Sequence, residues 1–136
     1  AQEALAFYDQ ATHSNSAICT QLQELVASGK TVAVWGGTGK AAAFINRYGL
    51  DAQRFPVVVD SDPDKVGTYV PGTGQEIRPS AYLTQHPVDV VLLATQWRAR
   101  DIVIEMEQKG ITARQVLLEH QGALIDYFSD PNPYRG

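Results

Sequence analysis

A glycine-rich turn, GGTGK at positions 36–40, has the residue types and spacing to hold a ligand. Glycine lets the backbone turn tightly and lets a phosphate approach closely. A helix directly after the turn would present free N–H groups and a partial positive charge to an anion. Residues 37–42, GTGKAA, also fit G-x-G-x-x-A, the relaxed dinucleotide-binding fingerprint. The predicted binding residues of this turn are Gly36, Gly37, Thr38, Gly39 and Lys40.

The carboxylate of Asp60 is a candidate partner of this turn. Asp60 ends a second apolar run, close to the offset of roughly 20 residues at which an acidic side chain takes a ribose hydroxyl. A structural alternative stays open, in which the glycines only let a helix pack close to its strand and Asp60 only begins a turn over residues 61–63. A P-loop is excluded, because Val34 and Ala41 stand where that motif needs its first glycine and its magnesium-binding hydroxyl.

A third candidate cluster follows a later apolar run and consists of Thr95, Gln96, Trp97 and Arg98. An exposed aromatic ring beside a guanidinium can stack on a base or bind a phosphate. The alternative is that a helix simply begins here and that Trp97 packs against the sheet. Both interpretations remain open from the sequence.

Neither a catalytic residue nor a metal site is predicted. The three histidines, His13, His86 and His120, are far apart and have no metal-ligand spacing. Cys19 has no obvious base, and the sequence holds no G-x-S-x-G nucleophile motif. We therefore expect a domain that binds without catalytic groups of its own.

Alternating strands and helices are expected to bring these residues to one edge of a sheet. Apolar runs predict buried strands over 31–35, 55–60, 88–95 and 115–118, and helical patterns cover 3–28, 40–48, 79–86 and 98–109. This alternation predicts a Rossmann-like α/β three-layer sandwich, with a small parallel sheet of about four to five strands and the first strand central. Ligands of such sheets bind beyond the carboxyl ends of the strands.

We expect three segments: an N-terminal helical linker over 1–28, a Rossmann-like domain over 29–120, and an irregular tail over 121–136 with at most a short helix near 123–127. The net charge of −4 and the lack of a Lys/Arg cluster argue against nucleic acid as a partner. No apolar run reaches the roughly 18 residues of a membrane span. A single cysteine fits a reducing, cytoplasmic compartment.

Three stretches together resemble the C-terminal domain of sugar C-methyltransferases, enzymes that act on nucleotide-linked deoxysugars. They are TVAVWGGTGKAAAFINRYGLD, VVVDSDPDKVGTYVPGTGQEI and RPSAYLTQHPVDVVLLATQW, within residues 29–118. The resemblance implies a Rossmann-like module that helps to enclose the nucleotide-linked sugar. It also implies that S-adenosylmethionine (SAM) and the catalytic residues belong to an earlier methyltransferase core domain. The absence of an initiator methionine fits a piece of such a longer protein.

Two other hypotheses remain. The fingerprint and Asp60 also suit a stand-alone domain that binds NAD(H) or another nucleotide. A module without a ligand, serving structure or homodimer formation, is the third hypothesis. Its support is the aromatic tail, because Tyr127, Phe128 and Tyr134 could anchor an interface.

Overall fold

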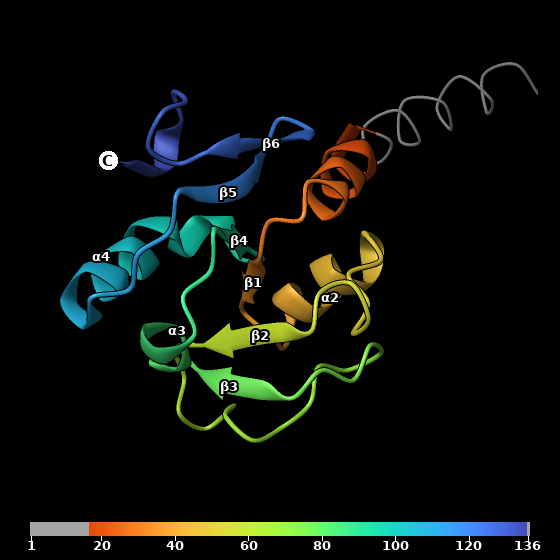
Figure 1. Ribbon diagram of the computed structural model, residues 1–136, viewed down its shortest axis with the longest axis vertical. Coiled ribbons are helices and arrows are strands. Elements are labelled where there is room, and N and C mark those ends of the chain that lie inside the picture. Colours follow the sequence, from red (N-terminus) through yellow and green to blue (C-terminus); the bar gives the residue numbers. More distant parts are fainter. Residues whose placement is uncertain (1–16, 136) are drawn as a thin grey trace, which may run out of the picture.

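The computed structural model describes residues 17–135 and contains one six-stranded sheet (Figure 1). Its strands are β1 (Val32–Trp35), β2 (Val57–Asp60), β3 (Ile77–Pro79), β4 (Val90–Leu93), β5 (Gln115–His120) and β6 (Ala123–Asp126). Residues 17–27 are helical, and the other helices are α2 (Lys40–Arg47), α3 (Tyr82–Gln85) and α4 (Ala99–Lys109). Two short 3-10 turns, η1 (Gln96–Arg98) and η2 (Pro133–Arg135), complete the description.

The sheet has the order β3-β2-β1-β4-β5-β6, with β1 at the switch point. β1 pairs in parallel with β2 on one side and with β4 on the other, so that Trp35 lies opposite both Val59 and Leu93. Only β6 runs antiparallel, against β5. The predicted α/β class, the Rossmann-like layers and the central first strand are therefore confirmed.

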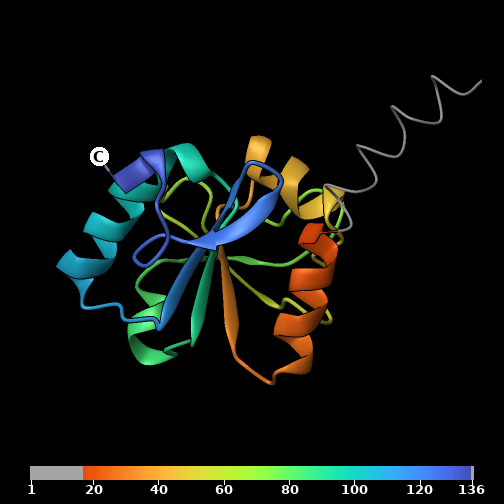
Figure 2. The ribbon, with the colours of Figure 1, turned by 90° about the horizontal axis from the view of Figure 1, so that it is seen from above.

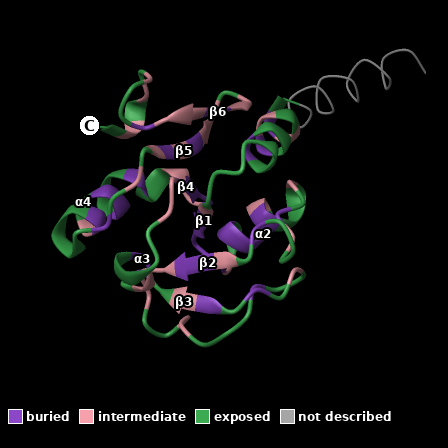
Figure 3. Ribbon diagram, in the orientation of Figure 1, coloured by how far each residue is buried: buried purple, intermediate pink, exposed green. Residues whose placement is uncertain are grey.

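Helices cover both faces of the sheet (Figure 2). The helix at 17–27 and α2 share one hydrophobic cluster with alternate strand residues such as Val34 and Leu92. On the other face, α4 packs on Ala33, Leu93 and their neighbours. The central strands are thus buried on both sides, as Figure 3 shows, which explains why they read as continuous apolar runs.

Two strands were missing from the sequence prediction. Ile77–Pro79 forms β3, whereas we expected Pro79 to lie in a helix over 79–86; α3 is a single turn that begins later. At the sheet edge, a strand as short as β3, with Arg78 and Pro79 in it, gives no apolar run.

The tail also differs from the prediction. Residues 123–126 form β6 in place of an irregular segment or short helix, and they pair with β5 through a two-residue turn. Gln121 (φ 54°) and Gly122 (φ 84°) both have positive φ, as a type I′ hairpin turn requires. Because only one of the two is glycine, the turn signal was weak. Of the predicted helix over 3–28, residues 17–27 are confirmed, and residues 3–16, with His13, lie outside the described part.

Candidate functional site

A polar crevice of about 170 Å³ opens at the carboxyl ends of β1, β2 and β4. Five of the ten predicted site residues line it, namely Gly36, Thr38, Asp60, Thr95 and Arg98. Its remaining lining residues are Trp35, Ala41, Asp62, Lys65 and Ile102. This edge of the sheet is where a switch-point ligand is expected.

Close packing fixes two of the glycines in the turn. Gly36 has φ +107°, and its N–H donates a 2.7 Å hydrogen bond to the Val59 carbonyl. A Cβ on Gly37 would lie only 2.6 Å from Cδ1 of Ile77. Gly39 differs, because it has φ +60° and nothing within 4 Å of the Cβ position. The packing role considered for the glycines thus applies to Gly36 and Gly37, whereas Gly39 leaves open space before α2.

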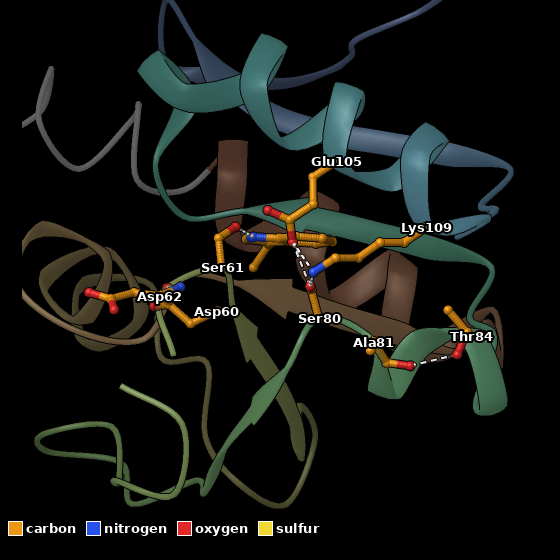
Figure 4. Close-up of polar contacts among 9 residues, drawn as sticks. Asp60, Ser61, Asp62, Ser80, Ala81, Thr84, Glu105 and Lys109 are labelled. Atoms are coloured by element: carbon orange, nitrogen blue, oxygen red, sulfur yellow. Dashed lines mark hydrogen bonds and ion pairs between the residues drawn. The ribbon is translucent and has the colours of Figure 1, made fainter. Parts of the chain in front are cut away.

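Asp60 connects the glycine turn to the loop after β2. Its Oδ2 accepts a hydrogen bond from the Gly37 N–H at 3.2 Å, and its Oδ1 accepts one from the Asp62 N–H at 3.0 Å. Asp60 and Asp62 lie side by side in Figure 4. Each carboxylate oxygen therefore already has a backbone donor, which holds the floor of the crevice in shape.

The crevice also contains the donors that an anion needs. α2 begins at Lys40, its N-cap residue Gly39 provides no side-chain cap, and its first turn has no acidic residue. Its first N–H groups and positive dipole end therefore meet no anionic side chain of the helix itself. Lys65 and the exposed Arg98 line the same space. The positive charge of these groups attracts a phosphate, and the negative charges of Asp60 and Asp62 partly offset that attraction.

The predicted site is divided between two cavities. Lys40, Gln96 and Trp97 line a neighbouring hollow of about 440 Å³, here named the Trp97 pocket. It is completed by Ala43, Phe44, Arg47, Tyr48, Ala94, Glu119 and Gly122. The Lys40 Nζ lies 5.4 Å from the centroid of a Trp97 ring. Gly37 and Gly39 line neither cavity.

Sequence reasoning missed several lining residues. Asp62 was considered only as part of a turn and Lys65 was not considered as a site residue, although both follow the end of β2 and line the crevice. Glu119 lies near the carboxyl end of β5, which is itself a signal for a site residue. Phe44 and Tyr48 are four residues apart in and just after α2, a spacing that places both on one side of the helix.

A polar cluster of Ser80, Glu105 and Lys109 lies beside the crevice (Figure 4). Ser80 is 2% exposed; its Oγ donates to Glu105 Oε2 at 2.5 Å and accepts from Lys109 Nζ at 2.7 Å. Burial alone would raise the pKa of Glu105, but hydrogen bonds from Ser80, Ser61 and Lys109 outweigh it and lower that pKa. Through the buried Ser80, which directly follows β3, the cluster connects β3 to α4.

Among residues 17–135, no three His, Cys, Asp or Glu side chains are grouped so that they could hold a metal ion. No helix in the same range is long and apolar enough to cross a membrane.

Comparison with known proteins identifies the family of the chain. The family model for the C-methyltransferase C-terminal domain matches residues 2–118. No curated protein sequence matches the chain significantly. Among solved structures, the UDP-D-quinovosamine 4-dehydrogenase of Vibrio fischeri superposes with a TM-score of 0.49 at 19% identity, covering 74% of this chain and 94% of that one.

Proposed function

Because this chain belongs to the C-methyltransferase C-terminal domain family, we propose that it is the accessory domain that holds the diphosphate of a nucleotide-linked sugar in the crevice. In this proposal, methyl transfer takes place in a separate core domain of the same cytoplasmic enzyme. The residues that bind the diphosphate are the turn before α2, Lys65, Thr95 and Arg98.

The observation that carries the proposal is the meeting of an uncapped helix N-terminus with two cations at the switch point. A diphosphate matches these donors in charge and in its many acceptor oxygens. The crevice volume of about 170 Å³ is below the roughly 300–1,000 Å³ of a pocket that encloses a whole ligand. The sugar end would therefore extend out of the crevice toward the core domain, as an enclosing role requires.

SAM does not fit the crevice. Its sulfonium carries a positive charge, whereas Lys65 and Arg98 already supply positive charge here. We therefore assign the methyl donor to the core domain and derive no step through it in this chain.

A stand-alone NAD(H) domain is the competing function. It relies on Asp60 as the acceptor of the ribose hydroxyls, and both Asp60 oxygens already accept backbone hydrogen bonds. The carboxylate can accept further bonds, so a direct comparison of ligands is needed.

An NMR amide-shift titration of the chain with a thymidine-diphosphate sugar, NAD and SAM, each added separately, tests the proposal. We expect the sugar nucleotide to shift the amides of residues 36–39 and 95–98. Arg98→Gln should weaken its binding roughly tenfold, the loss of one charge-assisted contact. Arg114→Gln is the charge-matched control, because Arg114 directly precedes β5 and so lies at the amino ends of the strands, away from the crevice. Binding of NAD that fails in Asp60→Ala would support the competing function, and no binding of any ligand would contradict both.

A further inference from the structure

The Trp97 pocket adjoins the crevice and has no role in the function proposed above. Thr95 and Arg98 line the crevice, whereas Gln96 and Trp97, between them in the chain, line the pocket. Lys40, the first residue of the helix whose N-terminus faces the crevice, lines the pocket too. A ligand in one cavity can therefore continue into the other.

The walls of the pocket suit a flat aromatic ring. Trp97 is 53% exposed, so part of its indole ring is open to a ligand. Phe44 and Tyr48 pack edge to face at 4.9 Å and give the pocket a second aromatic wall. At about 440 Å³ the pocket is within the size range of small-molecule sites. Stacking on such a ring is how proteins bind nucleobases.

The polar side of the pocket narrows the choice of ring. Gln96 Nε2 donates to Glu119 Oε2 at 3.3 Å, and Glu119 Oε1 accepts from the Gly122 N–H at 3.1 Å. Because the hydrogen bond from Gln96 to Glu119 is long, a ligand can replace it with hydrogen bonds of its own. Glu119 can then accept from a ring N–H, while the Gln96 amide donates to a neighbouring carbonyl. Uracil, thymine and guanine carry these two groups side by side, whereas adenine and cytosine carry no ring N–H on that edge.

We propose that the Trp97 pocket binds a nucleobase that carries a ring N–H beside a carbonyl (uracil, thymine or guanine), stacked on Trp97 and paired through Glu119 and Gln96. This inference rests on the proposed function, because the diphosphate in the crevice sets the position of the base. A surface of the core domain is the other conceivable occupant. The base is favoured because an acceptor and a donor stand beside an exposed indole in a concave site.

Trp97 fluorescence provides the test. The only other tryptophan, Trp35, is 2% exposed but lines the crevice, so the Trp97→Phe variant, in which Trp35 is the only tryptophan, measures its share of the signal. The probes are uridine diphosphate, adenosine diphosphate and inorganic pyrophosphate, with binding also measured by calorimetry. We expect uridine diphosphate to quench Trp97 and to bind more tightly than the other two.

Variants distinguish the contribution of the base to binding from that of the diphosphate. Trp97→Ala should weaken the binding of uridine diphosphate roughly tenfold or more, because the stacking of one base is lost. It should leave the binding of pyrophosphate unchanged. Trp97→Phe should recover part of the loss. Phe128→Ala removes an aromatic ring that is 48% exposed outside both cavities and should change nothing.

The outcomes distinguish the two proposals. If uridine diphosphate binds Trp97→Ala as tightly as the native chain, the base inference is overturned and the diphosphate proposal stands. Equal affinity for uridine and adenosine diphosphates would overturn the pairing by Glu119 and Gln96. If the native chain binds neither uridine diphosphate nor pyrophosphate, both proposals fail.

Discussion

The Gly37 N–H donates a hydrogen bond to Asp60 Oδ2 at 3.2 Å, so the turn after β1 is tied to the end of β2. The same carboxylate holds the Asp62 N–H through its other oxygen. One side chain therefore positions both the glycine turn and the acidic loop that line the crevice. Asp60, which the sequence predicts to bind a ligand, therefore also has a structural role.

Replacing Asp60 should destabilise the domain even without a ligand. Asp60→Asn keeps one oxygen but loses the charge and one acceptor, so we expect a loss of about 1–2 kcal/mol in unfolding free energy. Urea unfolding followed by circular dichroism measures it. Asp64→Asn, an exposed carboxylate in the same loop, should stay within about 0.5 kcal/mol of the native chain. Equal stability of the two variants would contradict the structural role.

A methyl group on Gly37 should be costly because of Ile77. The added Cβ would lie 2.6 Å from Ile77 Cδ1, and Ile77 is 1% exposed, so it has little room to move. We expect Gly37→Ala to cost about 1–3 kcal/mol. Ile77→Ala removes both Cδ1 and Cγ1, which lie 2.6 and 2.8 Å from the added Cβ, and the double variant should be about 1 kcal/mol more stable than the sum of the single effects predicts. Strict additivity in denaturant unfolding would show that the two residues do not clash.

The sequence predicted the central strands well and the division of the site poorly. β1 and β4 are buried on both faces, and this burial itself produces the apolar runs. The two cavities depend on η1, which begins at Gln96. A 3-10 turn has about three residues per turn, so Thr95 and Arg98 lie on one side, and Gln96 and Trp97 lie elsewhere. Sequence patterns predict that a turn follows a strand, but they do not give its helical phase.

The Glu105 cluster should make stability depend on pH in the acid range. The pKa of Glu105 is lower in the folded chain than in the unfolded one, where it is about 4.3. The stabilisation is therefore fully present above about pH 4.3 and is lost as the pH falls through the folded pKa. Glu105→Gln should cost about 1–3 kcal/mol at pH 7, and its difference from the native chain should shrink below about pH 4.

Glu107→Gln, on the exposed side of the same helix, is the control for this pH dependence. Its unfolding free energy should follow that of the native chain from pH 7 down to pH 3. A Glu105→Gln deficit that stays constant over this range would mean that the cluster acts through packing and not through the charge of the carboxylate.

The β5–β6 turn offers a stabilising substitution. Gln121 has φ 54°, a conformation that a side chain disfavours and that glycine adopts freely. Gln121→Gly should therefore raise the unfolding free energy by about 0.5–1 kcal/mol, whereas Gln108→Gly, within α4, should lower it by about 1 kcal/mol. Thermal unfolding of both variants measures the contrast. Because Gly122 lines the Trp97 pocket, a firmer turn should also preserve or tighten uridine diphosphate binding. Weaker binding in a more stable Gln121→Gly variant would show that the Gln121 side chain itself takes part in the pocket.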